Sequence, residues 1–314
     1  KTMNNSIKLY SNETTKTFHI SVDGQQFQNC QLEPHVLKVL FGQDPNDFSP
    51  EIVIDEKIEN IALYRMIKSH FWSIDCNASL IAALDPKYNG VGKSKKSQFK
   101  EKAHGFGEMV QIVYEIINSN IEKPTEGDVF EFGCFTGIGS AKLSLAASFL
   151  NKKFYGFDSF QGLPDINEYG TGNQKEIYAA NDYSGSKDLV ETNVKIHGCS
   201  KNLGLIEGYF SETLEPFFKN KKDQKIAACF IDADISKSID ECLEYVIPRL
   251  SVGSLLIMHE VNDSDNFDVF HKHDLFNTDT YEMYTVGSHG QTTDFKSKKD
   301  MENMHGCGIL RKIK

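Results

Sequence analysis

Residues 129–140 read Val129-Phe130-Glu131-Phe132-Gly133-Cys134-Phe135-Thr136-Gly137-Ile138-Gly139-Ser140. An apolar strand, predicted over 128–132, runs into a glycine-rich turn, and a helix rich in Ala and Leu follows from about Ser140 to Leu150. Glycines in the turn let the backbone fold back tightly and let a ligand approach it without meeting a Cβ atom. The amides at the start of the helix point to the same place. The stretch therefore predicts a parallel α/β sheet that binds an adenosine-containing cofactor beyond the carboxyl ends of its strands.

The chain beyond residue 105 alternates helices with strands. A continuous apolar run at 226–231 fits a strand buried on both faces, and residues 239–250 have the spacing of an amphipathic helix. Further helices are predicted at 105–119 and 186–197. Strands are predicted at 128–132, 153–157, 203–206, 226–231, 255–258, 281–286 and 308–313. This alternation predicts an α/β fold with a Rossmann-like, doubly wound sheet, mostly parallel, with an antiparallel strand near the C-terminus.

The first 95 residues form a separate compositional unit, for which we expect a smaller α+β appendage. Alternating apolar residues before Asp23-Gly24 predict a hairpin near 17–29. Short helices are expected from Pro34 to Leu40 and up to His70. The stretch 89–102, rich in Gly and Lys, indicates a boundary. We therefore expect an appendage over 1–95, serving as a lid, a dimer contact or an acceptor platform, and a cofactor-binding domain over 96–314.

Composition excludes several classes of protein. The net charge of −10 over 314 residues repels phosphate backbones, so nucleic acid is not an expected partner. Seven cysteines without a CxxC pair indicate free thiols in a reducing compartment. No apolar run approaches the ~20 residues that span a bilayer, and the N-terminus lacks the pattern of a signal peptide. We therefore expect a cytoplasmic protein with no membrane partner.

Asp158 ends the second predicted strand, about 20 residues beyond the glycine turn. An acid there can accept hydrogen bonds from both ribose hydroxyls of a nucleotide cofactor, in nicotinamide enzymes and methyl-donor enzymes alike. The alternative is a loop carboxylate that caps a helix. The glycine spacing, GxxxGxG, differs from the GxGxxG of dinucleotide-binding enzymes, which favours a methyl donor.

Two further strands end in ionisable residues. Asp232 and Asp234 follow the strand at 226–231, and His259 and Glu260 follow the strand at 255–258. In a parallel sheet these four side chains meet at the same edge as the glycine turn. They can hold a divalent cation or supply a general base. Alternatively, one or two of them merely cap the segments that follow.

Other candidates are weaker. His271, His273 and Asp274 resemble a metal cluster, but all three come from one segment, so a solvated loop is favoured. Cys134 lies inside the glycine turn, where we expect it to be a small packing residue, because nothing near it in sequence marks a nucleophile.

Taken together, these features resemble a class I S-adenosylmethionine (SAM)-dependent methyltransferase, and more narrowly the macrocin O-methyltransferase family of sugar O-methyltransferases. The resemblance covers about residues 105–314, and its most specific parts are DSFQGLP at 158–164 and GYFSETL at 208–214. The other matching stretches are GDVFEFG at 127–133, FIDAD at 230–234 with Ser238, and PRLSVGS at 248–254.

The resemblance implies roles for individual residues. The donor would be held by Glu131, Gly133 and Gly137 at its methionine part, by Asp158 and Ser159 at its ribose, by Gly208 and Tyr209 at its adenine, and by Asp232. Asp232 would also be the first metal ligand and a candidate base. The family usually has two adjacent acids where this chain has His259 and Glu260. These residues could complete a site for Mg²⁺ or another divalent cation, or His259 could be the base of a metal-free variant.

The function implied is methyl transfer from SAM to a hydroxyl of a small molecule, most naturally a sugar or a sugar-containing metabolite, by an enzyme compatible with a homodimer. Three other classes compete with it. A nicotinamide-dependent oxidoreductase would need the GxGxxG turn that this chain lacks. A non-catalytic interaction protein on a methyltransferase scaffold has no need of the acids at the strand ends. A nucleic-acid methyltransferase would show a basic face, which the net charge disfavours.

Overall fold

The structure is a computed structural model that describes residues 106–259, 261, 263–287, 292–294 and 307–314, together with segments 7–12, 17–22 and 25–27 and individual positions between 63 and 74. Contacts between Cα atoms divide the chain into two compact units, Lys1–Asn89 and Gly90–Lys314. The predicted helix at 34–40 and the boundary segment at 89–102 lie outside the described residues.

The described part of the first unit contains a small antiparallel sheet. Its strands are β1 (Ile7–Asn12), β2 (Thr17–Val22) and β3 (Gln25–Phe27), in that order. Val22 pairs with Gln25, so the predicted hairpin is confirmed. Positions in the stretch 63–74 are helical, and its buried side chains recur every three or four residues, at Tyr64, Ile67, Phe71 and Ile74. That spacing is the apolar stripe of an amphipathic helix.

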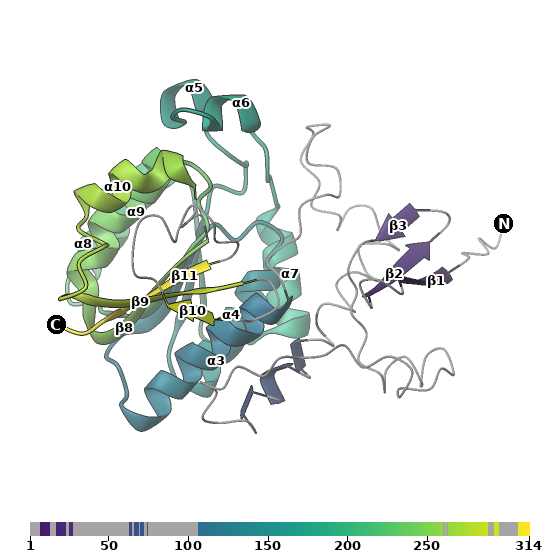
Figure 1. The fold of residues 1–314 in the computed structure, drawn as a ribbon, viewed down its shortest axis with the longest axis horizontal. Helices are drawn as coiled ribbons and strands as arrows, with labels where there is room; N and C mark the ends of the chain where they lie inside the picture. The colour runs from purple at the N-terminus through teal and green to yellow at the C-terminus, as the bar shows by residue number, and fades with distance from the viewer. Residues whose placement is uncertain are drawn as a thin grey trace. The chain divides into compact units, whose positions relative to one another are not determined.

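The second unit is built on an eight-stranded sheet (Figure 1). In spatial order its strands are β10 (Thr292–Asp294), β9 (Tyr281–Val286), β11 (Cys307–Lys312), β8 (Leu250–Met258), β7 (Ile226–Ile231), β4 (Asp128–Phe132), β5 (Phe154–Asp158) and β6 (Leu203–Glu207). Neighbours from β8 to β6 run parallel, whereas β11 is antiparallel to both β8 and β9. The predicted doubly wound, mostly parallel sheet with an antiparallel C-terminal strand is therefore confirmed.

Helices cover both faces of this sheet (Figure 1). On one side lie α3 (Phe106–Glu122), α4 (Ile138–Phe149) and α7 (Lys187–His197), which contact one another in the pairs α3–α4 and α4–α7. On the other side lie α8 (Phe210–Asn220), α9 (Ser236–Val246) and α10 (Phe267–Lys272). With both faces covered, the central strand β7 is apolar throughout, and all six of its residues are buried.

The order of the strands places a crevice beside the glycine turn. The chain leaves β4 for β5 and then β6, and returns to form β7 on the opposite side of β4. In open α/β sheets, ligands bind outside the carboxyl ends of the strands where the order reverses in this way. The reversal lies between β4 and β7, so the site is expected at the ends of these two strands. Among the described helices, none is long and apolar enough to cross a membrane.

Candidate functional site

A cavity of about 520 Å³ opens at the carboxyl ends of β4, β5, β7 and β8. Most residues singled out in the sequence line it, namely Glu131, Gly133, Asp158, Ser159, Tyr209, Asp232, Asp234 and His259. Tyr169, Tyr178 and Tyr183 add an aromatic wall from the segment that joins β5 to α7. The strand ends thus meet in space as the parallel sheet predicts.

The glycine turn brings the ends of β4 and β7 into contact. Gly133 has φ +91°, and a Cβ atom there would lie 1.9 Å from the carbonyl oxygen of Asp232. Only glycine fits, because a side chain would overlap that oxygen and favour another backbone conformation. Gly133 therefore sets the distance between the turn and Asp232.

Gly137 serves the packing of two helices. It precedes the first turn of α4 with φ +84°, and a Cβ atom there would lie 2.7 Å from Cα of Val190 in α7. It is not among the described residues that line the cavity. Its contact with the methionine part of a donor stays a prediction.

Asp158 holds the glycine turn through its carboxylate. Oδ2 accepts hydrogen bonds from the amides of Cys134, at 2.7 Å, and Phe135, at 3.0 Å, and Oδ1 accepts one from the amide of Phe160, at 2.7 Å. A carboxylate oxygen has two acceptor positions, so the remaining one belongs to Oδ1. The geometry leaves room for one ribose hydroxyl rather than two.

Glu131 is buried at the base of the cavity. Ser140 of α4 donates a short hydrogen bond to it. Burial raises its pKa from 4.5 to about 8; the hydrogen bonds from Ser140 and Cys134 oppose that rise, and Asp232 and Asp158 add to it. A carboxyl group with so high a pKa loses its proton readily only when a cation lies beside it.

The DSFQGLP segment forms a compact turn. Ser159 Oγ donates to the carbonyl of Gly162, at 2.8 Å, and accepts from the amide of Gln161, at 3.0 Å. Across the cavity, Tyr209 precedes the first residue of α8. Gly208 donates its amide to the carbonyl of Asp158, at 3.0 Å, and is not among the described residues that line the cavity. Ser159 and Tyr209 therefore line the cavity, while Gly208 connects β6 to the start of α8 and is hydrogen-bonded to the end of β5.

Asp232 and His259 are in direct contact on the cavity wall. Asp232 follows β7 and His259 follows β8, and their atoms Oδ1 and Nδ1 are 3.2 Å apart. Both side chains are partly exposed, at 21% and 36%. A carboxylate held by an imidazole in a cavity can accept a proton from a bound hydroxyl group.

Comparison with known proteins decides the family. Residues 103–278, more than half of the chain, match the model of the macrocin O-methyltransferase (TylF) family. The chain belongs to this family. It is accordingly a SAM-dependent O-methyltransferase, as its strand ends and glycine turn indicate.

A solved structure, that of NovP, agrees with the fold of this O-methyltransferase. The O-methyltransferase NovP is 15% identical, with a TM-score of 0.50 over 77% of this chain and 100% of NovP. The calicheamicin methyltransferase CalS11 is also 15% identical, with a TM-score of 0.49 over 86% of this chain and 97% of CalS11. A comparison with curated proteins found no match.

The donor set at Asp232 does not suit Mg²⁺. The described members of the predicted set are one carboxylate and one imidazole, and they contact each other. Mg²⁺ prefers an octahedron of oxygen ligands, whereas imidazole suits zinc and other transition metals. Glu260, the third predicted ligand, lies outside the described residues. A cation held by Asp232, His259 and Glu260 therefore stays a prediction.

Sequence analysis missed the residue that anchors the segment over the cavity of this methyltransferase. Gln174, fully buried in the short helix α6 (Gln174–Ile177), accepts from the amide and the hydroxyl of Ser236 and donates to Asp263 Oδ2 and Asn266 Oδ1. These bonds measure 3.0–3.1 Å. No local pattern marks a glutamine in a polar loop as buried.

Of the weaker candidates, His273 is not among the residues that line the cavity, whereas Cys134 is. His273 Nε2 is 2.7 Å from Asp240 Oδ1, in a surface cluster with Lys272. Cys134 is buried, and burial raises the pKa of its thiol well above the usual value, as expected of a packing residue.

Proposed function

We propose that this O-methyltransferase transfers the methyl group of SAM to a hydroxyl group of a sugar or a sugar-containing metabolite, with Asp232 as general base and His259 as its partner. The observation that carries the proposal is the contact between Asp232 and His259 on the cavity wall, beside the glycine turn. The base thereby lies next to the place where the fold binds its donor.

The donor is proposed to lie across the ends of β4 and β5. Glu131 would face its ammonium group, Gly133 would permit close approach of the backbone, and Asp158 with Ser159 would receive the ribose. Tyr209 would pack against the adenine. This arrangement is supported by the position of these side chains on the cavity wall.

The reaction is an in-line displacement. The acceptor oxygen forms a bond to the methyl carbon as the carbon–sulfur bond breaks, and the bonding electrons pass to sulfur, giving neutral S-adenosylhomocysteine. A free hydroxyl is a weak nucleophile at neutral pH, so its proton passes to Asp232 as the bond forms. His259 donates Nδ1–H to Oδ1 and holds the carboxylate in place. Near-attack geometry supplies much of the remaining acceleration.

The acceptor side of the cavity supports a sugar. Tyr169, Tyr178 and Tyr183 present both aromatic faces and hydroxyl groups, and such side chains contact the apolar and the polar parts of a ligand together. Lys237 lies over the ring of Tyr169, 3.7 Å from its centroid, and pairs with Glu168 at 3.1 Å. These contacts fix the orientation of Tyr169.

The test is a kinetic comparison of wild type with Asp232→Asn and His259→Gln on a panel of nucleotide sugars and glycosylated metabolites, following formation of S-adenosylhomocysteine. Loss of the base should lower kcat about 10²- to 10⁴-fold in Asp232→Asn, while calorimetry should show nearly unchanged affinity for S-adenosylhomocysteine. His259→Gln should lower kcat by a smaller factor and shift the pH profile.

Asp188→Asn, an exposed substitution on α7 outside the cavity lining, is the matched control and should behave as wild type. Full turnover by Asp232→Asn would remove Asp232 as the base. Methylation of the glycosylated metabolites at a hydroxyl outside their sugar would replace the sugar with another class of hydroxyl acceptor.

A further inference from the structure

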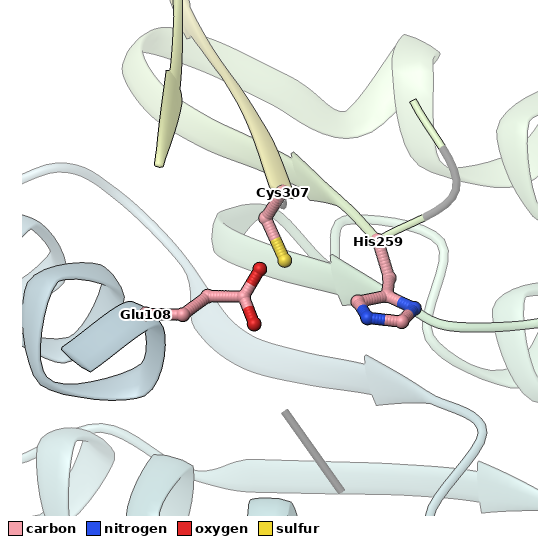
Figure 2. A group of neighbouring side chains, drawn as sticks. All are labelled: Glu108, His259 and Cys307. Atoms are coloured by element: carbon pink, nitrogen blue, oxygen red, sulfur yellow. The ribbon is translucent and has the colours of Figure 1, made fainter. Parts of the chain in front are cut away.

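His259 also belongs to a second group of side chains. Glu108, His259 and Cys307 each offer one ligand atom, and these three atoms lie within 4.8 Å of one another (Figure 2). Among the described residues, this is the one group of three or more metal-ligating side chains whose ligand atoms come this close together. Asp232 is not a member of it.

The fold brings the three residues together from distant parts of the chain. Glu108 lies in the first turn of α3, which packs against β8 and β9. Gly308 pairs with Met258 in the antiparallel ladder of β11 and β8, and extension of that register places Cys307 opposite His259. Their positions therefore follow from the sheet and from one helix packed on it, and not from a mobile loop.

The two ring nitrogens of His259 can bind two partners at once, Asp232 on one side and a metal ion on the other. Its Nδ1 atom is the one beside Asp232, and Figure 2 shows the other ring nitrogen turned towards Glu108 and Cys307. Metal-bound histidines commonly donate their second ring N–H to a carboxylate, which fixes the tautomer and the ring orientation. Asp232 is placed to be that carboxylate.

Burial adds a second argument. The side chains of Glu108 and Cys307 are 3% and 0% exposed, whereas His259 reaches the cavity. A cation can neutralise a buried carboxylate and a buried thiolate together. The cavity offers a path by which the ion can enter past His259.

From these observations we propose that Glu108, Nε2 of His259 and the thiolate of Cys307 bind a thiophilic divalent cation of the Zn²⁺ type. A set of carboxylate, imidazole and thiolate suits Zn²⁺ and disfavours Mg²⁺. Metal–ligand bonds of about 2.0–2.3 Å place tetrahedral ligand atoms roughly 3.3–3.8 Å apart, so small side-chain rotations close the set. Three protein ligands leave a fourth position for water or a ligand from the cavity.

The site shares His259 with the proposed reaction, so its first test is spectroscopic and does not depend on turnover. Full-length protein freed of metal with a chelator is titrated with Co²⁺, whose thiolate complexes have an intense near-ultraviolet charge-transfer band. We expect one Co²⁺ per chain with this band, displacement by Zn²⁺, and no displacement by Mg²⁺ at the same concentration. No charge-transfer band in the wild type, or displacement by Mg²⁺, would overturn the proposal.

Variants assign the ligands. Cys307→Ser should abolish the band, and it should weaken Zn²⁺ binding at least about 100-fold. Glu108→Gln should keep the band and weaken binding about 10- to 100-fold. Cys199→Ser, at another free cysteine, is the matched control and should leave both unchanged. A band that survives Cys307→Ser or disappears in Cys199→Ser would assign the metal to another thiol and contradict the site.

A titration of each variant with S-adenosylhomocysteine separates this proposal from the function. Retained donor binding by Cys307→Ser shows that the variant is folded, so a lost metal signal then reports the ligand alone. Metal binding by a wild-type protein that methylates no sugar would support the site while the proposed acceptor fails. If Cys307→Ser does not fold, the Zn²⁺ affinity of Glu108→Gln tests the site instead. An affinity equal to that of the wild type would count against the site.

Discussion

At the scale of single residues, burial of Glu131 opposes ionisation of its carboxyl group. Its pKa is raised from 4.5 to about 8, chiefly by burial. Below about pH 4.5 the group is protonated in both the folded and the unfolded chain. Between pH 4.5 and 8 only the unfolded chain releases the proton freely, so the free energy of unfolding falls as pH rises. Glu131 thus opposes stability at neutral pH in the absence of a donor.

Glu131→Gln should remove this pH dependence. Between pH 5 and pH 8 the wild type should lose on the order of 3 kcal/mol of stability that the variant keeps. Chemical denaturation of both proteins at the two pH values measures the difference, and the exposed substitution Glu126→Gln serves as control. Parallel losses in wild type and Glu131→Gln would show that Glu131 ionises normally.

Asp158 stabilises the glycine turn through hydrogen bonds that are present without a cofactor. Asp158→Asn replaces one acceptor oxygen with an amide donor, which then faces a backbone amide it cannot bond. We expect a loss of about 1–3 kcal/mol in the free energy of unfolding, together with weaker binding of S-adenosylhomocysteine. Asp165→Asn, where an exposed aspartate accepts from the amide of Asn167, should be nearly neutral. Equal effects of the two substitutions would contradict a special role for the turn.

At the scale of elements, the segment from β5 to α7 is fixed over the cavity. Two short helices, α5 (Ile166–Tyr169) and α6, lie within it, and Gln174 joins the segment to the start of α9. Its side chain satisfies several buried polar groups at once. Removing it leaves those groups unpaired in a site that the chain has closed to water.

Gln174→Ala should therefore destabilise the protein by about 2–4 kcal/mol and speed hydrogen exchange across 163–184. Because Tyr169 and Tyr178 belong to this segment, KM for the acceptor should rise more than the dissociation constant of S-adenosylhomocysteine. Asn173→Ala, an exposed neighbour without a side-chain capping bond, is the control. An acceptor KM that does not change would show that the segment does not shape the acceptor site.

At the scale of the whole molecule, the described cavity is built from one of the two compact units. Every residue that lines it falls between Glu131 and Asp263, within the unit Gly90–Lys314. A chain shortened to residues 90–314 is therefore expected to fold and to bind S-adenosylhomocysteine as the full chain does. Calorimetry on both chains measures this. Lost turnover with retained donor binding would favour an acceptor platform or a lid for residues 1–89, and lost donor binding would contradict the prediction.

Periodic patterns in the sequence predicted several strands and the edge of the sheet at which the site lies. The unbroken apolar run of β7 predicted a strand buried on both faces, because helices must cover both faces of a parallel sheet. The glycine turn, and the acids that follow β5 and β7, predicted a site at one edge, because parallel strands end on the same side. The helix α8 was missed, since Pro216 interrupts a pattern carried by Leu214 and Phe218.

The sequence by itself determined the sheet, the edge at which the cavity opens and most of the predicted residues that line it, since these depend on local periodicity and on the direction of parallel strands. Only the tertiary structure decided what each side chain contacts. Asp158 binds three amides from two separate turns, Gln174 is buried by a loop that folds back, and Cys307 reaches His259 through the register of two strands about 50 residues apart. Contacts between distant segments leave no periodic trace in the sequence, because they arise only when the packed elements bring those segments together.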